Sequence, residues 1–289
     1  ERLDINVMEL AKLISENTLN SQRAILIPTE ITNTSLKNYL IPNNNFPGSI
    51  YGSSSLKIEE DKENKLIKII QNQTDDWILI NNTDVSGWTF IFIGLSPTSM
   101  KDGIQEQRFN KFGFTGCLNF HNTSFNKNHI EVISGGCEDG LNIVNSDGQI
   151  NSIKVNNVAA DAIDLDFSNI SISSVNIISA GNDCFDVSGG VYRIISFASM
   201  DCSDKGISVG EHSILLAEDL NIHSKTIGIS SKDSSKVFLK RAKIDAINCF
   251  ESSQKKQEFG GSYLEAEYAS CKNPSIIDKH SLVNIRNEF

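Results

Sequence analysis

Apolar and polar residues alternate along this chain in short stretches that recur every 22 residues. Five such stretches read EDGLNIV (138–144), ADAIDLD (160–166), NDCFDVS (182–188), DKGISVG (204–210) and TIGISSK (226–232). Their fourth position is always apolar, and a second alternating stretch follows each about ten residues later. Short alternating strands at a fixed period, with no helical pattern between them, predict an all-β solenoid.

The period also predicts the kind of solenoid. A coil of 22 residues suits a right-handed parallel β-helix with about three short strands per coil, stacked ~4.8 Å apart. We expect seven or eight coils within residues 70–289, clearest over 117–271, with a C-terminal capping segment. Residues 1–69 predict an N-terminal cap, because apolar residues at helical spacing favour a helix over 3–18 and residues 55–70 resemble a hairpin.

Carboxylates gather on one side of this predicted lattice. Positions four and six of each stretch point into the coil, so positions five and seven point outward. The outward positions, and position two just before the strand, hold Asp161, Asp164, Asp166, Asp183 and Asp186. Between residues 138 and 192 eight residues are acidic and only Lys154 is basic. This density favours a chemical role over simple solvation of the surface.

The spacing of the carboxylates suits glycoside hydrolysis. Asp164 and Asp186 stack at about one strand spacing, ~5 Å, whereas Asp164 and Asp166 lie ~7 Å apart on one face. Carboxyl pairs ~5–5.5 Å apart serve retaining glycosidases, and pairs ~6.5–9.5 Å apart serve inverting ones. Crowded like charges raise the pKa of at least one member, which then acts as general acid. The predicted acid/base set is Asp164, Asp166, Asp183 and Asp186.

Other side chains near this face are candidates for contacting a sugar. Lys205 lies one coil beyond Asp183, and Lys232 one coil beyond Gly210, so either could offset the acids or hold the substrate. An aromatic ring followed by a guanidinium can stack on and hydrogen-bond a sugar. The predicted substrate-binding residues are Asp161, Tyr192, Arg193, Lys205, Glu211, His212 and Lys232.

Three alternatives stay open for the acidic face. It could be solvated decoration without a function, or a structural Ca²⁺ site, because clustered carboxylates suit that hard cation. It could also belong to a non-catalytic β-helix that binds glycans. No cofactor is predicted, with Ca²⁺ as the alternative.

The six cysteines follow the same period. Pairs 20, 18 and 22 residues apart are Cys117 with Cys137, Cys184 with Cys202 and Cys249 with Cys271. Residues one coil apart are stacked neighbours within disulfide range. The spacing favours three disulfides and an oxidising compartment, which would make the protein secreted, periplasmic or attached to the cell surface. The alternative is a set of buried free thiols.

Bulk properties narrow the choice of partners. The chain has 289 residues and a net charge of −10, which argues against nucleic acids and anionic membranes. The longest apolar run, WTFIFIGL (88–95), is far shorter than the ~20 residues that span a bilayer. The predicted partner is a polysaccharide or oligosaccharide.

The repeat and the acidic face together resemble the pectin-lyase-like superfamily of right-handed parallel β-helices over residues 117–271. Within it the polygalacturonase-type glycoside hydrolases are nearest in pattern. ADAID (160–164) and GNDCFD (181–186) are similar in place to the first two acidic motifs of those enzymes, and RAK (241–243) to their Arg-x-Lys. The stretch DKGISVGEHS (204–213) occupies the third place but lacks the histidine of the Gly-His-Gly motif.

The same resemblance also offers a lyase. Polysaccharide lyases of this fold use Ca²⁺ and a Lys or Arg base on uronic acids, and Lys205 beside Asp183 and Asp204 would suit that reaction. An acidic groove repels a polyanion unless calcium bridges the two, so the sequence favours hydrolysis of a neutral or amino-sugar glycan. The runner-up is a calcium-assisted lyase or epimerase.

Overall fold

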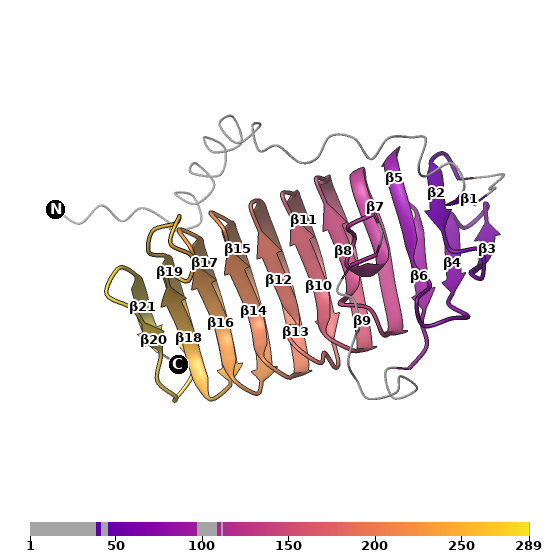
Figure 1. Ribbon diagram of the computed structural model, residues 1–289. Coiled ribbons are helices and arrows are strands. Elements are labelled where there is room, and N and C mark those ends of the chain that lie inside the picture. The colour runs from indigo at the N-terminus through magenta and orange to yellow at the C-terminus, as the bar shows by residue number, and fades with distance from the viewer. Residues whose placement is uncertain (1–38, 42–45, 97–108, 111, 289) are drawn as a thin grey trace.

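The protein is an all-β solenoid. The computed structural model describes residues 39–41, 46–96, 109–110 and 112–288, and these contain 21 strands in one continuous sheet and no α-helix. From β4 onward the neighbouring turns pair in parallel, which gives a parallel β-solenoid of about ten turns. Figure 1 shows the turns stacked side by side along an elongated molecule. The predicted fold class is therefore confirmed.

One face of the solenoid, here named the short-strand face, is a parallel stack of mostly short strands that includes the first part of the long strand β7. In order along the stack they are β5 (Ile78–Asp84), β7 (Gly116–Gly135), β8 (Asp139–Val144), β10 (Asp161–Asp166), β12 (Phe185–Ser188), β14 (Lys205–Gly210), β16 (Ile227–Lys232), β18 (Asn248–Ser253) and β20 (Ile276–Ile277).

A second stack completes each turn, and it includes the rest of β7. Its other members are β4 (Leu66–Ile70), β6 (Thr89–Ile93), β9 (Asp147–Val158), β11 (Asn169–Ile177), β13 (Val191–Cys202), β15 (Ile214–Ser224), β17 (Lys236–Asp245), β19 (Tyr263–Ser270) and β21 (Leu282–Glu288). In β11 and β17 two consecutive residues are exposed in mid-strand, such as Ser173 and Ser174. This break in the alternation marks a corner of the coil. One long strand therefore bends at the corner and occupies the place of two of the three short strands that the sequence predicts for each coil.

Antiparallel pairs precede the solenoid. β1 (Leu40–Ile41) pairs with β2 (Ser49–Gly52), which pairs with β5, and β3 (Lys57–Asp61) pairs with β4. The β3–β4 pair is the hairpin that the alternation over 55–70 predicts. The helix expected over residues 3–18 lies outside the described residues.

The core runs down the inside of the coil. Inward residues such as Ile163, Leu165, Phe185 and Val187 are fully buried in one hydrophobic cluster. Small residues are needed where each turn tightens before a short strand: a Cβ on Gly206 would clash with the side chain of Ile222. The 22-residue register thus follows directly from the alternation in the sequence.

The number of turns is larger than the seven or eight expected. The additional turns involve β4, β5 and β6, whose parallel pairing begins before residue 117. Forty residues separate the partners of β5 and β7, as in Ile78 with Leu118, and those of β6 and β7, as in Thr89 with His129, so these pairs do not show the 22-residue period. Periodicity alone therefore missed it.

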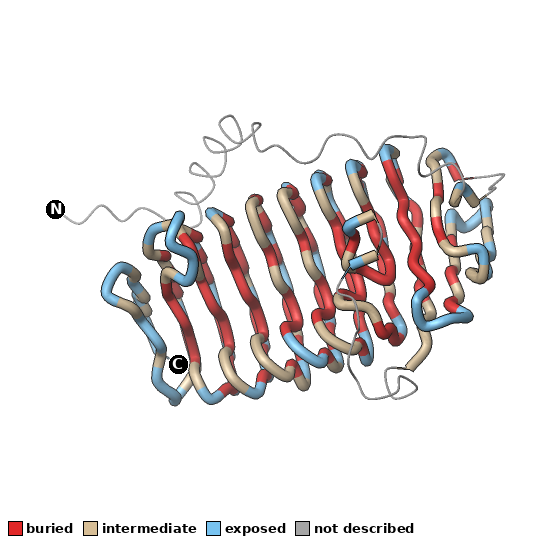
Figure 2. The backbone as a smooth tube through the Cα atoms, viewed as in Figure 1, coloured by how far each residue is buried: buried red, intermediate tan, exposed pale blue. Residues whose placement is uncertain are grey.

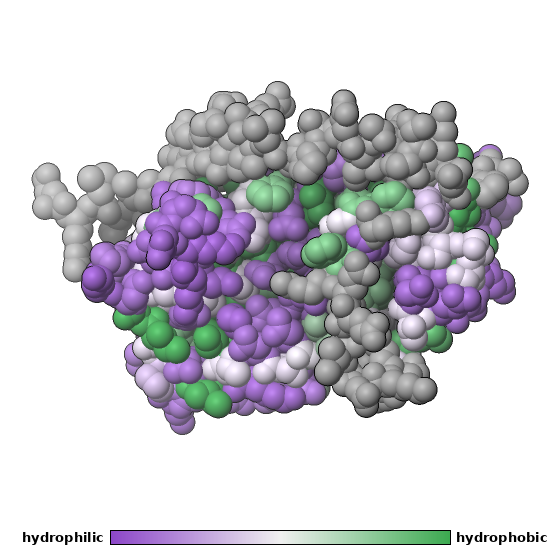
Figure 3. Space-filling model, in the orientation of Figure 1, coloured by the Kyte–Doolittle hydropathy of each residue, from purple (hydrophilic) through white to green (hydrophobic). Residues whose placement is uncertain are grey.

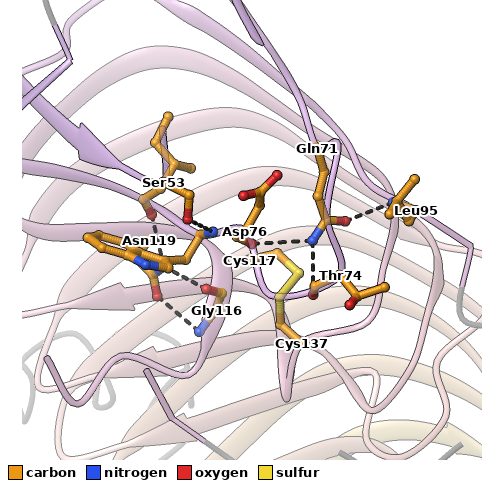
Figure 4. The surroundings of a disulfide bond; sticks show 11 residues. Ser53, Gln71, Thr74, Asp76, Leu95, Gly116, Cys117, Asn119 and Cys137 are labelled. Atoms are coloured by element: carbon orange, nitrogen blue, oxygen red, sulfur yellow. Dashed lines mark hydrogen bonds between the residues drawn. A yellow bond between two sulfur atoms is a disulfide. The ribbon is translucent and has the colours of Figure 1, made fainter. Parts of the chain in front are cut away.

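All three expected disulfides are present. They join Cys117 to Cys137, Cys184 to Cys202 and Cys249 to Cys271, with Cα–Cα distances of 5.3, 5.4 and 5.9 Å. Figure 4 shows the first of them beside a hydrogen-bonded corner, in which Asn119 Nδ2 donates to the Gly116 carbonyl at 2.6 Å. Three disulfides are typical of a protein that folds outside the reducing cytoplasm.

Candidate functional site

The predicted carboxylates meet on the short-strand face. Asp164 of β10 lies directly opposite Asp186 of β12, while their neighbours Ile163 and Phe185 point into the core. Asp166 follows two residues along β10 and points to the same side. We call Asp139, Asp161, Asp164, Asp166, Asp183 and Asp186 the carboxylate cluster.

This face is recessed rather than flat. Asn142, Ser208 and Ser230 point outward from β8, β14 and β16, yet all three are buried. Figure 2 shows the strands of this face mostly in red, with intermediate positions in β10 and β12. Figure 3 shows hydrophilic residues beside a hollow in the surface on this side of the molecule. Asp164, Asp166 and Asp186 stay half-buried, so a solute can still reach them.

Burial and mutual repulsion keep protons on several of these carboxyl groups. Burial raises the pKa of Asp166 to about 6, and the charge of Asp186 adds to the effect. Burial also raises the pKa of Asp164 well above its usual range, with Asp139, Asp166 and Asp186 acting in the same direction. Carboxyl groups that hold a proton near neutral pH can act as general acids.

Asp161 and Asp183 also hold successive turns of the solenoid together. They lie at the corner before the short strands, where the Oδ1 of Asp161 accepts from the backbone N of Asp183 at 2.8 Å and the Oδ1 of Asp183 accepts from the backbone N of Lys205 at 2.9 Å. Each carboxylate therefore fastens one turn to the next. Burial raises the pKa of Asp161 to about 7, and the charge of Asp183 adds to the effect.

Lys205 lies at the same corner, and its side chain is paired with two carboxylates of the protein. Its Nζ lies 3.2 Å from the Oδ1 of Asp183 and also contacts Asp204. Although burial acts against it, the charge of Asp183 helps to raise the pKa of Lys205, which stays protonated. Within the described residues, no ion pair joins a cation to Asp164, Asp166 or Asp186.

Two predicted sugar contacts lie elsewhere. Tyr192 is completely buried, and its hydroxyl donates toward the carbonyls of Leu165 and Ser188 at 2.8 and 3.0 Å. Its ring therefore has no surface to offer a sugar. Arg193 is exposed on β13, in the second stack of strands, where its Nη2 lies 2.6 Å from Glu218.

The remaining predicted contacts lie beside the face, where turns and a loop form its edge. Glu211 pairs with Lys256 of the loop that precedes β19, and the exposed His212 ring packs edge-on against Phe259 at 4.9 Å between centroids. Lys232, at the end of β16, is half-buried. These residues can border a bound ligand, and the charge of Glu211 adds to the raised pKa of Asp166.

Sequence reasoning left out three residues that belong to the site. The Nδ2 of Asn142 lies 3.4 Å from Asp164. The Oδ2 of Asp139 and the Oγ of Ser208 are buried without a hydrogen-bond partner. Asn142 and Ser208 hold position five of their stretches, and Asp139 holds position two, so the 22-residue alignment contained the signal.

A metal ion has little support from this arrangement. Among the described residues, no group of three or more His, Cys, Asp or Glu side chains converges closely enough to hold one. The carboxylates are instead spread over successive turns of the solenoid. The same part of the chain has no helix of sufficient length and apolarity to cross a bilayer.

Comparisons with known proteins add nothing to the geometry. No family model matches the chain, and neither the curated proteins nor the solved structures contain a match. The resemblance to the pectin-lyase-like superfamily extends to the parallel β-solenoid and goes no further.

Proposed function

We propose that this protein cleaves glycosidic bonds in a polysaccharide, with Asp164, Asp166 and Asp186 as the reacting carboxyl groups. One observation carries the proposal: these three side chains share one recessed face, and Asp164 and Asp166 have raised pKa values. Carboxyl groups with strongly perturbed pKa values in a hollow are the usual sign of an acid/base site.

Each carboxyl group has a role in this proposal. Asp164 donates a proton to the leaving oxygen, because burial and three neighbouring carboxylates favour its protonated form. Asp186, one strand spacing away at ~4.8 Å, is the partner that attacks the sugar. Asp166 lies ~6.6 Å from Asp164 along the strand and would instead activate water in an inverting reaction. The anomeric form of the first product distinguishes the two routes.

The corner acids take a supporting part. Asp183 was predicted to react, but its carboxylate is held by the backbone N of Lys205 and by the Nζ of the same residue. We therefore place Asp161 and Asp183 among the residues that position β10 and β12. A lyase reaction with Lys205 as base is disfavoured, because that amine is protonated and ion-paired.

The location follows from the disulfides. Three disulfides support a secreted, periplasmic or cell-surface protein, where polysaccharides are the accessible polymers.

The test is release of reducing ends from a panel of neutral, amino-sugar and uronate polysaccharides. On a cleaved substrate, Asp186→Asn and Asp164→Asn should each lower kcat by ~10²-fold or more. Asp219→Asn is the matched control, because Asp219 is exposed on β15 and pairs with Arg241 away from the site. Full activity of both site variants would show that the assignment is wrong, and an unsaturated uronate product would show a lyase.

A further inference from the structure

Two buried polar atoms without partners lie at the two ends of the carboxylate cluster. Ser208 lies opposite Asp186 on the next turn, and its side chain points to the same side of the sheet. Asp139 lies opposite Asp161 on the preceding turn. The Oγ of Ser208 and the Oδ2 of Asp139 contact neither solvent nor a hydrogen-bonding group. An unpaired buried polar group destabilises a protein, so each such atom needs an explanation.

The cluster is rich in carboxyl groups and poor in cations. Among the described residues, Asp183 is the one member of the six that is paired with a lysine. The carboxylate of Asp186 accepts no hydrogen bond from the described residues, and Asp164 has only the long contact of 3.4 Å from Asn142. Donors and positive charge are what this surface lacks. A ligand that brings both would relieve the repulsion that now keeps protons on the acids.

The spacing indicates an extended ligand. The residues concerned belong to β8, β10, β12 and β14, four consecutive turns that span roughly 14 Å along the solenoid axis. A single metal ion needs ligands converging on one point, and the described residues offer no such group. A chain that carries amino groups at intervals would instead meet several carboxylates in succession.

From this geometry we infer that the short-strand face binds a glycan with free amino groups, a polymer of unacetylated hexosamine, whose ammonium groups lie against Asp166 and Asp186 and donate to Ser208. The inference rests on the proposed function for the identity of the face, and names its substrate class. Ser208 is a positioning residue in this arrangement. Acetylation of the amines would remove the charge and add bulk, and a uronate polymer would be repelled.

The dependence on pH follows from the same groups. An ammonium ligand binds ionised carboxylates, so its binding displaces the proton of Asp166, while Asp164 keeps the proton that it donates in the proposed reaction. Burial raises the pKa of Asp166 to about 6, so affinity should increase as the pH rises from 5 towards 6, and should decrease again where the amines of the hexosamine lose their own protons near neutrality. Increasing salt should weaken binding throughout this range.

The experiment is calorimetric titration of the full chain with four probes. These are a β-linked glucosamine tetramer, its N-acetylated counterpart, a galacturonate tetramer and spermine, which supplies ammonium groups without a sugar. We expect the glucosamine tetramer to bind at least ~10-fold more tightly than each of the others, the worth of one charged hydrogen bond. Equal or tighter binding of any other probe, or no binding of the glucosamine tetramer at millimolar concentration, overturns the inference.

Variants locate the binding site. Asp186→Asn should weaken glucosamine-tetramer binding by about tenfold, and Ser208→Ala should weaken it by a few-fold with a Tm equal to or higher than that of the parent. Ser174→Ala, an exposed serine on β11, and Asp219→Asn are the matched controls and should bind as the parent does. If Asp186→Asn binds as tightly as the parent, the ligand does not lie on this face and the inference fails.

Failure of the inference and failure of the proposed function give different results. Binding of the glucosamine tetramer without release of reducing ends would leave the inference standing and remove catalysis. Cleavage of a neutral glycan without preference for free amines would keep catalysis and remove the inference.

Discussion

The aspartates of the repeat are chemically identical in sequence but not in their surroundings. Asp183 has a lysine and a backbone N–H beside it, whereas Asp164 has other carboxylates. Asp204, next to Lys205, shows how strongly such partners act. Hydrogen bonds from Lys205 and Thr226 overcome the effect of burial and lower the pKa of Asp204. A single residue type therefore supplies both turn-fastening groups and candidate acids.

Stability should fall as the pH rises through the raised pKa values. Asp161, with a pKa of about 7, and Asp166, with a pKa of about 6, hold protons in the folded state at pH values where the unfolded chain, near 3.9, has lost them. The folded state binds more protons in this window, so the free energy of unfolding decreases between about pH 4 and pH 7. Burial lowers the pKa of His121, and this shift makes the free energy of unfolding increase with pH. It is a single group, whereas several carboxyl groups act in the other direction.

The variant Asp166→Asn measures this effect. It should raise Tm at pH 7 by ~2–4 °C, the shift that ~1 kcal/mol produces in a chain of this class, and should change Tm little at pH 4. Melting curves from pH 4 to 8 for the parent, Asp166→Asn and the control Asp219→Asn test it. A lower Tm for Asp166→Asn at pH 7 would contradict the origin that we give for the raised pKa.

At the scale of elements, the corner before each short strand links successive turns. Asp161 and Asp183 accept backbone hydrogen bonds from residues 22 positions later, and Lys205 ends the run by pairing with Asp183. The following strands place inward and outward residues by simple alternation. Corner and strand together hold Asp164 opposite Asp186.

Removal of Lys205 should loosen this corner. Lys205→Ala leaves the buried carboxylate of Asp183 without its cation and should destabilise the fold by ~3 kcal/mol. The matched control is Lys225→Ala, which breaks an exposed pair with Asp201 and should cost less than ~1 kcal/mol. Urea midpoints give the comparison. The loss of stability in Lys205→Ala should be smaller at pH 5, where Asp183 accepts a proton more easily. Equal losses of stability in the two variants would show that the buried pair contributes no more than the exposed one.

At the scale of the whole molecule, three disulfides are distributed along the solenoid. Each closes a loop of 18 to 22 residues and joins β7, β13 or β18 to a residue near the next turn. Each turn of a solenoid contacts mainly its neighbours, so in the described part of the chain stability depends on contacts between adjacent turns. Covalent links between adjacent turns therefore oppose unravelling where it would begin.

Reduction should lower the stability considerably. A closed loop of about this length contributes ~3 kcal/mol, so loss of all three disulfides should lower Tm by more than ~6 °C. Alkylation of the unfolded chain followed by mass measurement should show no modified cysteine without reductant and six after reduction. Modification without reductant would contradict the pairing.

Much of this architecture could be predicted from local pattern. Alternation assigned Ile163 and Leu165 to the core and Asp164 to the outside, and the 22-residue spacing placed Asp164 beside Asp186 and Cys249 beside Cys271. These predictions succeeded because strand period and coil length are properties of consecutive residues. The early turns were not predicted, because the long connection between β6 and β7 separates their partner residues by more than the 22-residue period.

Other features were decided only by the tertiary structure. Glu211 pairs with Lys256, 45 residues later, because loop conformation and not the 22-residue register sets that contact. Tyr192 lies in the core, where its hydroxyl is used by backbone groups. The depth of the short-strand face, and with it which carboxyl groups keep their protons, depends on atoms brought together from many turns. The sequence determined the lattice because alternation is local, and the folded chain decided the chemistry because burial is not.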